Sequence, residues 1–259
     1  MLVEKKIVEV RGRQLGADKQ PLICAPLTGN HQEGILSELD KVMAKKPDLI
    51  EWRVDHFYQI ENVQAVINSA KKIRETAGDV PIIFTNRSQR EGGQPISLSE
   101  KDIVELYTEI CKTQTVDIID FELSNQTEHL HYLRKVSYDT GIKMIMSYHN
   151  FDFTPSGDVL NKKFSEAEAY DADIVKAAVM PKTLEDVLKL LNVTLQADKK
   201  LSIPLITMSM GGYGSLTRMF GGVFGSAVTF AVGENSSAPG QIPIEDLKTV
   251  LNIVKKSIG

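Results

Sequence analysis

The sequence predicts an α/β protein with the fold of a (β/α)8 barrel, the TIM-barrel architecture. Eight short runs of apolar and β-branched residues recur along the 259-residue chain, and segments with helical periodicity separate them. The runs begin about 24 to 36 residues apart, which matches one strand plus one crossover helix. Alternating units of this kind predict a parallel sheet, and eight of them predict a closed barrel.

Each expected element follows from its residue pattern. The expected strands lie at residues 21–25, 49–54, 81–85, 116–123, 142–147, 174–179, 203–208 and 227–232. The expected helices lie at 33–45, 63–76, 100–112, 127–137, 165–170, 184–195 and 244–254, and several begin with Ser, Thr or acidic start signals. The seventh connection, residues 210–220, is rich in glycine and gives the weakest helix pattern.

The segment ahead of the first unit predicts a short N-terminal β-hairpin. Residues 5–13 alternate apolar and polar side chains before Gly16, and we expect the hairpin to close the bottom of the barrel. A doubly wound sheet is the alternative, but residues 26–31 lack its glycine fingerprint and no phosphate-binding loop motif occurs. Since no linker or low-complexity tract interrupts the pattern, we expect one domain over residues 1–259.

Composition excludes several kinds of site and partner. The 30 basic and 34 acidic residues give a net charge of −4 without a basic segment, so nothing indicates binding to nucleic acid or to a membrane surface. No stretch reaches 18 consecutive apolar residues, and the first residues lack a signal-peptide core, which favours a cytoplasmic location. Cys24 and Cys111 fit reduced core thiols, and no histidine spacing indicates a metal site.

Charged residues interrupt the second expected strand. Its two-residue period places Glu51 and Arg53 on one face and Trp52 and Val54 on the other. The large apolar side chains should face the helices, so the acid and the base should point into the barrel. A structural ion pair is the alternative, although buried charges are retained more often for a site than for stability.

The fourth expected strand repeats this pattern with two acids. Asp120 and Glu122 share one face of residues 116–123 and should also point inward. We expect them mainly to balance the interior cations and to hold those cations in place, with a direct chemical role as the alternative.

Two neighbouring strands bring a lysine and a histidine to the same end of the barrel. Lys176 lies among small and apolar residues, where desolvation disfavours the ammonium and produces a neutral amine able to attack a carbonyl carbon. His149, at the end of the fifth strand, suits proton transfer near neutral pH. The alternatives are a lysine paired with an acid and a structurally satisfied histidine. Because C-terminal strand ends form the active sites of such barrels, the pair favours Schiff-base chemistry with acid–base assistance.

Loops at that end carry further candidates. Arg87 and Glu91 follow the third strand, and Arg218 follows the seventh, where its guanidinium can bind a carboxylate through two parallel hydrogen bonds. Residues 234–241 combine small residues with Ser237 and Gln241, which predicts a lid that is mobile alone and ordered by substrate. An ordinary surface loop is the alternative.

A set of motifs spread over most of the chain accompanies these residues: Glu51 to Asp55, Arg87 with Glu91-Gly92-Gly93, Met146 to Phe151, Lys176, Ser209-Met210-Gly211 with Gly214 and Arg218, Phe224 to Ala227, and Ser237 to Gln241. Together they resemble the type I 3-dehydroquinate dehydratase family. Thr217, where the family often has serine, and residues 231–233 depart from the family pattern. Both departures spare the functional side chains.

The resemblance implies a lyase that dehydrates 3-dehydroquinate to 3-dehydroshikimate, the third step of the shikimate pathway for aromatic amino-acid biosynthesis. It implies no metal, no organic cofactor and a homodimer. Lys176 would form an iminium with the C3 ketone, His149 would move protons at C2 and at the C1 hydroxyl, and Glu91 would orient His149. Arg218 would bind the substrate carboxylate, and the other substrate contacts would come from Glu51, Arg53, Arg87, Ser237 and Gln241.

Two other classes of function stay open at this point. A class I aldolase uses the same barrel and lysine but cleaves a carbon–carbon bond and usually binds phosphate, so the choice of substrate discriminates it. A catalytically idle scaffold would be expected to lack Lys176 or His149, and both are present.

Overall fold

The computed structural model describes residues 7–17 and 20–258, so the expectations for residues 1–6, which include the start of the predicted hairpin, lie outside the described residues. The hairpin strands are β1 (Val8–Val10) and β2 (Arg13–Leu15). The other strands are β3 (Leu22–Leu27), β4 (Leu49–Arg53), β5 (Ile82–Thr85), β6 (Ile118–Glu122), β7 (Lys143–Asn150), β8 (Ile174–Val179), β9 (Leu205–Ser209) and β10 (Val228–Phe230). The helices are α1 (Gln32–Ala44), α2 (Val63–Ala77), α3 (Glu100–Thr113), α4 (Thr127–Thr140), α5 (Gly157–Ala169), α6 (Leu184–Lys200), α7 (Gly211–Phe220) and α8 (Ile244–Ile258), with 3-10 turns η1 (Val54–His56), η2 (Gln89–Glu91) and η3 (Gly221–Phe224).

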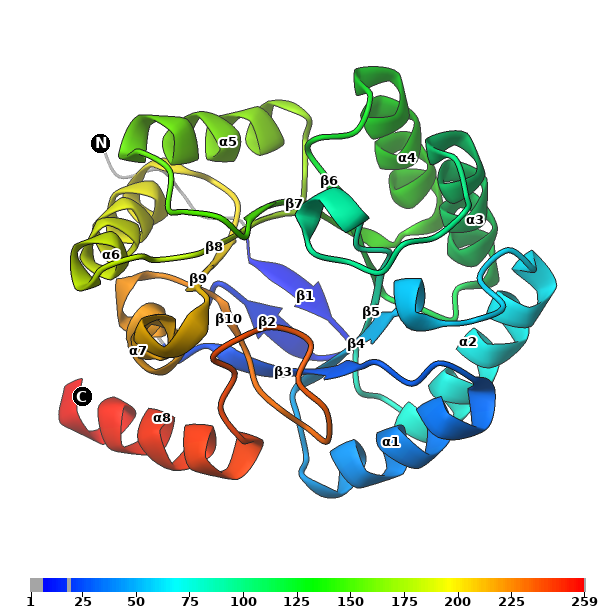
Figure 1. The fold of residues 1–259 in the computed structure, drawn as a ribbon, viewed down its shortest axis with the longest axis horizontal. Coiled ribbons are helices and arrows are strands. Elements are labelled where there is room, and N and C mark those ends of the chain that lie inside the picture. Colours follow the sequence, from blue (N-terminus) through cyan, green and yellow to red (C-terminus); the bar gives the residue numbers. More distant parts are fainter. Residues whose placement is uncertain (1–6, 18–19, 259) are drawn as a thin grey trace.

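Strands β3 to β10 form one parallel sheet that curls into a nearly closed barrel, and the helices surround it (Figure 1). The order is β10-β3-β4-β5-β6-β7-β8-β9, and a bridge between Leu205 and Ser226 joins the two ends. The predicted (β/α)8 barrel is confirmed, and each expected run overlaps one of these strands. Among the described residues, no helix is both long and apolar enough to cross a bilayer.

Side chains alternate between two apolar cores along the strands. Outward-facing Trp52 and Phe84 pack beneath the helices, with their ring centroids 5.6 Å apart in an edge-on contact. Inward-facing Leu49 belongs to a second buried cluster inside the barrel, near the N-terminal ends of the strands. Cys24 and Cys111 are buried free thiols, as predicted. The inner cluster therefore forms an apolar floor beneath the polar end of the barrel.

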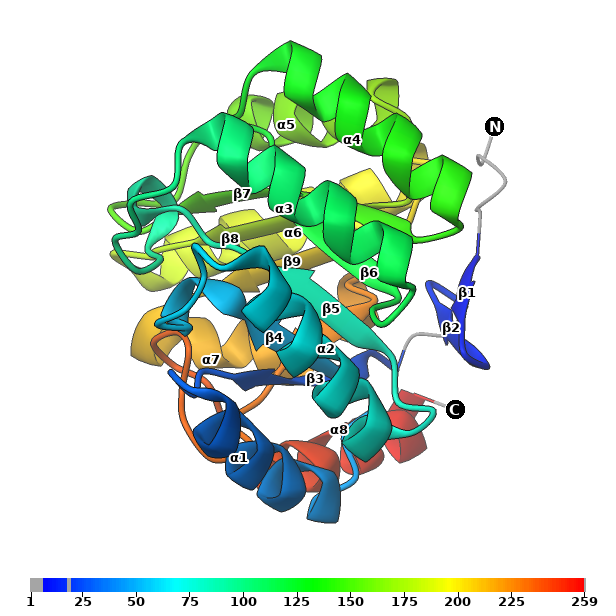
Figure 2. The same cartoon turned by 90° about the vertical axis from the view of Figure 1, so that its right-hand side faces the viewer.

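The β1–β2 hairpin lies across the N-terminal end of the barrel, as predicted (Figure 2). Val8, Val10 and Leu15 are buried and join the inner apolar cluster. Arg11 in the turn has a φ of 45°, and its Nε donates a 2.5 Å hydrogen bond to Asp117, just before β6. The second strand continues past the predicted end at residue 13. The hairpin leaves the C-terminal end of the barrel as the open mouth.

Helix α5 begins at Gly157, whereas the sequence pattern predicted a helix only from residue 165. The side chain of Ser156 accepts a hydrogen bond from Val159 N and caps the helix. Leu160 and Phe164 are buried one turn apart. The amphipathic signal is therefore present in the first half of the helix, but glycine at its first position obscures it.

The glycine-rich seventh connection is a regular helix, α7, and two of its glycines have different surroundings. A Cβ atom at Gly214 would stand 2.3 Å from the carbonyl oxygen of Ser209, whereas one at Gly212 would meet no atom within 4 Å. Gly214 therefore permits the close approach of α7 to the end of β9. Gly212 serves no such contact.

Alanine substitutions test this packing. Gly214→Ala is expected to lower the free energy of unfolding by about 1 to 3 kcal/mol, because the added methyl group pushes α7 away from β9. Gly212→Ala, the matched control, is expected to raise it by up to about 1 kcal/mol through helix propensity. Urea denaturation followed by circular dichroism measures both effects. Equal effects of the two substitutions would contradict the packing role of Gly214.

Candidate active site

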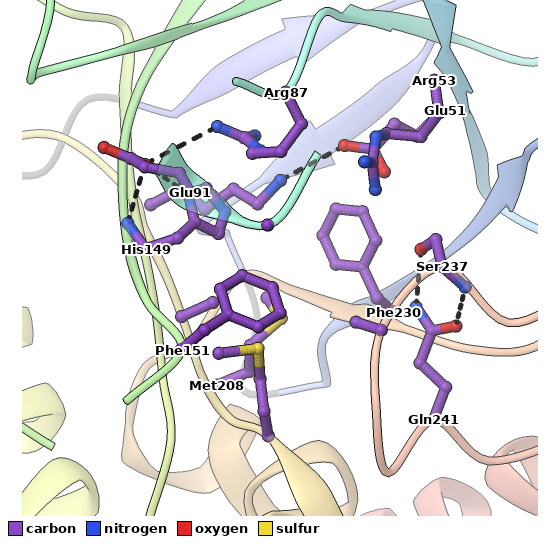
Figure 3. A pocket seen from close by; sticks show the side chains of 15 residues that line it. Glu51, Arg53, Arg87, Glu91, His149, Phe151, Met208, Phe230, Ser237 and Gln241 are labelled. Carbon is purple, nitrogen blue, oxygen red and sulfur yellow. Dashed lines mark hydrogen bonds and ion pairs between the residues drawn. The ribbon is translucent and has the colours of Figure 1, made fainter. Parts of the chain in front are cut away.

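A cavity opens at the C-terminal ends of the strands, and the space among its lining residues, counted together with its opening to solvent, is about 420 Å³ (Figure 3). Most of the predicted site residues line it, namely Glu51, Arg53, Arg87, Glu91, His149, Lys176, Ser237 and Gln241. Arg218 is the exception, and it contacts the lining residues Met208 and Phe230 from behind. The structure therefore brings the predicted residues to one mouth of the barrel.

Lys176 lies inside the barrel on β8, and its side chain is 5% exposed. Its Nζ donates hydrogen bonds to Asp120 Oδ2 at 2.8 Å and to Glu51 Oε1 at 3.2 Å. The same nitrogen lies 4.5 Å from the ring centroid of Phe230 on β10. The surroundings are therefore less apolar than the strand sequence suggests, because two carboxylates contact Nζ and fix its position.

The two acids of β6 contact the interior cations, as expected. Asp120 Oδ1 accepts hydrogen bonds from Arg87 Nη2 at 2.9 Å and from Ser147 Oγ at 2.6 Å. Burial by itself raises the pKa of Asp120, but the charges of Arg87 and Lys176 outweigh burial and hold that pKa well below its usual range. Glu122 Oε1 accepts from Arg87 Nη1 at 2.9 Å. Each of these acids is therefore held in place by the cation whose charge it neutralises.

Arg87 is a buried cation whose terminal nitrogens already bind acids. Burial alone lowers the pKa of Arg87, but the charges of Asp120, Glu122 and Glu91 raise it above its usual value. The side chain is 4% exposed. Arg87 therefore acts on the cavity through its permanent charge more than through free N–H groups.

His149 and Glu91 form a buried pair at the cavity wall, with side chains 7% and 6% exposed. Glu91 Oε2 accepts hydrogen bonds from the backbone N and from Nδ1 of His149, both at 2.9 Å. His149 lies at the end of β7, and Glu91 closes the 3-10 turn η2. The pair fixes the orientation of the imidazole and leaves Nε2 for other partners.

Burial shifts the pKa of each member of this pair. Burial and the charge of Glu122 raise the pKa of Glu91 to about 7, although Arg87 opposes the shift. Burial, followed by the charges of Arg87 and Lys176, holds the pKa of His149 well below its usual 6.5. The imidazole is therefore neutral near pH 7, the form that can accept a proton.

Arg53 is held by an acid that the sequence pattern did not single out. Its Nε and Nη2 donate 2.8 Å hydrogen bonds to the two oxygens of Asp55. Asp55 also accepts from the backbone N of Gln94 at 3.0 Å, which ties it to the loop after β5. The spacing Arg-x-Asp at the end of a strand is the signal from which this pair can be found. Asp55 thus orients Arg53 at the cavity edge.

Arg218 is a buried guanidinium on α7 without an acidic partner among residues 7–17 and 20–258. Nη1 donates to Phe230 O at 3.2 Å, Nη2 donates to Pro239 O at 3.2 Å, and Nε has no hydrogen-bond partner. Burial lowers the pKa of Arg218 to about 10, so the group stays charged at neutral pH. Such a cation is electrostatically suited to an anionic ligand.

The segment 234–241 lies over the cavity and is held by its own contacts. Ser237 N donates to Gln241 Oε1 at 3.0 Å, and Gln241 Nε2 donates to Ser237 Oγ at 3.2 Å. Gly211 N donates to Pro239 O at 3.1 Å, which fastens the segment to α7. The polar side chains of Ser237 and Gln241 therefore meet each other at the cavity rim, and the expected ordering by substrate stays a prediction.

An apolar wall completes the cavity and was missed at the level of the sequence. Phe151, Met208 and Phe230 line it beside the charged residues. Met208 and Phe230 occupy inward positions of β9 and β10, so strand alternation was the signal that could have identified them. Of this wall, Phe230 lies directly beside the Lys176 amine.

Comparisons with known proteins agree with this geometry. A model of the type I 3-dehydroquinase family matches residues 23–258. The 3-dehydroquinate dehydratase of Geobacillus sp. (strain WCH70) is 56% identical over 256 residues, which cover 99% of this chain and 98% of that protein. The 3-dehydroquinate dehydratase of Aromatoleum aromaticum is 49% identical over 251 residues, which cover 97% and 96%.

Solved structures give the same result. The crystal structure of 3-dehydroquinate dehydratase from Geobacillus kaustophilus matches with a TM-score of 0.95 and 46% identity over 99% of each chain. The type I enzyme from Clostridium difficile, solved with covalently modified comenic acid, matches with a TM-score of 0.94 and 37% identity over 98% of this chain and 99% of that one. This chain belongs to the type I 3-dehydroquinase family.

Proposed function

We propose that this chain converts 3-dehydroquinate into 3-dehydroshikimate and water through a Schiff base on Lys176. The observation that carries the proposal is the placement of Lys176 and His149, which line one cavity from the neighbouring strands β8 and β7. An amine and an imidazole side by side are the groups needed for dehydration through an iminium. Membership of the family supports the same activity and a place in the shikimate pathway.

Lys176 acts first in the proposed reaction. Its ammonium gives up a proton to the carboxylate of Glu51, whose Oε1 lies 3.2 Å from Nζ, while Asp120 stays ionised beside Arg87. The neutral Nζ then attacks the C3 carbonyl carbon, and the carbinolamine loses water to leave an iminium. The iminium draws electrons and acidifies the hydrogen at C2.

His149 performs both later proton transfers. The neutral imidazole takes the proton from C2 and the electron pair moves into an enamine. The imidazolium then donates its proton to the C1 hydroxyl, which leaves as water. Hydrolysis of the conjugated iminium releases 3-dehydroshikimate and restores Lys176. Glu91 keeps the imidazole oriented and stabilises its charged form between the two transfers.

The remaining residues bind the substrate in this proposal. Arg218 supplies the positive charge for the carboxylate, because the guanidinium is buried without an acidic partner among the described residues. Glu51 and Arg53 face the ring hydroxyls, and the charge of Arg87 acts across the cavity. Ser237 and Gln241 close the cavity above the substrate ring.

A solved relative is consistent with a covalent step. The Clostridium difficile enzyme was solved with covalently modified comenic acid. A covalently modified small acid in a protein of the same family fits an enzyme with a reactive nucleophile.

The proposal also keeps the expectations of a homodimer, a cytoplasmic location and a single domain. Light scattering on the purified protein tests whether it is a dimer.

Trapping by borohydride tests the covalent step. With 3-dehydroquinate present, borohydride is expected to inactivate the enzyme and leave a ligand on the peptide containing Lys176, because reduction converts the iminium into a stable secondary amine. Peptide mass spectrometry locates the adduct. Lys176→Met should abolish labelling and turnover, whereas Lys143→Met, at the other end of the barrel, should leave both intact. Equal labelling of surface lysines would refute covalent catalysis, and cleavage of a carbon–carbon bond would indicate an aldolase.

Replacement of His149 separates proton transfer from amine chemistry. His149→Ala is expected to lower kcat by about 10² to 10⁴ because it removes the acid–base group. Borohydride trapping at Lys176 should persist, since the amine is a different group. Turnover is followed by the absorbance of the conjugated product and labelling by mass spectrometry. Near-normal turnover in His149→Ala would exclude the assigned role.

The pH profile reports on the Glu91–His149 pair. The pKa of Glu91 is raised to about 7, so activity is expected to fall as the pH decreases through this value and the pair gains a proton. In Glu91→Gln the low-pH limb should move to lower pH, because His149 alone then titrates and its pKa lies well below 6.5.

A matched acid elsewhere controls for the pH experiment. Glu100 accepts a hydrogen bond from His129 outside the cavity, and Glu100→Gln should leave the profile unchanged. Measurements of kcat/KM from about pH 5 to about pH 9 resolve the limb. A limb at the same pH in wild type and Glu91→Gln would show that Glu91 does not control it.

A further inference from the structure

Ser124 lies outside the cavity but contacts a residue that lines it. It occupies the turn between β6 and α4, and its hydroxyl lies 2.8 Å from Glu91 Oε1. Asn125 N and Nδ2 donate to Glu122 O at 3.2 and 3.0 Å and close this turn. The backbone of the turn therefore holds the Ser124 hydroxyl against Glu91.

This contact completes the restraint of the Glu91 carboxyl group. Oε2 already receives the backbone N and the Nδ1 of His149, both at 2.9 Å. Bonds to one oxygen leave the carboxyl group free to swing about that oxygen. The bond from Ser124 to Oε1 fixes the second oxygen, so the plane of the carboxyl group is set.

A hydroxyl is chemically suited to this position. It donates a hydrogen bond to an ionised carboxylate, and it accepts one from a protonated carboxyl group. The proposed reaction moves a proton onto His149 and off it again, so the charge beside Glu91 changes twice in each turnover. A serine can follow both changes by rotating its O–H bond, with no movement of the backbone.

We propose that Ser124 is a positioning residue for the proton transfers at His149, and that its hydroxyl holds Glu91 in one orientation in both protonation states. The inference rests on the proposed function, because it assigns the proton transfers to His149. Ser124 does not line the cavity, so it acts through Glu91 and has no contact with the substrate.

The charges around Glu91 set the direction of the expected effect. The charged groups that act on the Glu91–His149 pair come from β4 to β8 and the loops after them, namely Arg53, Arg87, Asp120, Glu122 and Lys176. Burial and Glu122 raise the pKa of Glu91, whereas Arg87 and the hydrogen bond from Ser124 lower it. Loss of the Ser124 hydroxyl therefore raises the pKa of Glu91 further.

Ser124→Ala tests the inference at an exposed position. The low-pH limb of kcat should move up by about half to one pH unit, and kcat near pH 7 should fall by about three- to tenfold. The KM for 3-dehydroquinate should stay within about twofold, because no substrate contact is lost. Ser124→Thr keeps the hydroxyl and should restore the wild-type profile.

Asn125→Ala is the matched control. It removes the Nδ2 bond to Glu122 O but keeps the backbone bond from residue 125 that closes the turn, and it leaves the Ser124 hydroxyl at Glu91, so the pH profile should stay in place. An unmoved profile in Ser124→Ala, or an equal shift in Asn125→Ala, would overturn the inference. Failure of the proposed function looks different, because wild-type enzyme would then show no trapping at Lys176. A wild type that traps and turns over, with an unmoved Ser124→Ala profile, defeats the role of Ser124 alone.

Discussion

Mutual neutralisation of buried charges is the constraint on which the rest of this structure depends. Lys176 and Arg87 both bind Asp120, and Glu51 and Glu122 complete the set from either side. Removing one member leaves an uncompensated charge in a dry interior, which typically costs about 3 to 5 kcal/mol. Each partner is therefore fixed by the others. The same contacts that stabilise the interior aim the amine at a single point of the cavity, so stability and reacting geometry are coupled here.

The inward face of a barrel strand such as β4 is apolar near its N-terminal end and charged near its C-terminal end. Near the N-terminal end, inward residues such as Leu49 pack in the apolar cluster that the hairpin covers with Leu15. Two positions further along the same face of β4, Glu51 reaches the cavity. The charged site thus rests on a layer of close-packed side chains, which resists displacement when the charges rearrange. The loops that follow the strands supply the outer residues of the cavity and do not take part in this apolar layer.

Much of this arrangement is predictable from the sequence because the two-residue period of a strand decides which way a side chain points. It placed Glu51 inward and Trp52 outward, and the structure confirms both. The period does not say which inward residues meet across the barrel. The contact between Lys176 on β8 and Glu51 on β4 depends on strand tilt and barrel radius, which no local pattern encodes. The roles of Asp55 and Ser124 were not predicted for a related reason. Acids and serines are common in turns, and the roles of these two depend on contacts with residues far away in the sequence, Gln94 for Asp55 and Glu91 for Ser124.

The barrel is joined unevenly around its circumference. Five residue pairs connect β8 with β9, whereas within the described part of the chain the bridge at the seam joins Leu205 of β9 to Ser226, which lies two residues before β10. The amine and the imidazole stand on the continuous ladders, while Arg218 and the segment 234–241 follow the two strands at the seam. Separating the strands at the seam breaks fewer backbone hydrogen bonds than separating β8 from β9, so we expect local opening to require less free energy there. The backbone ladder is thus most continuous at the strands that carry Lys176 and His149, and least continuous at the strands that precede Arg218 and the segment 234–241.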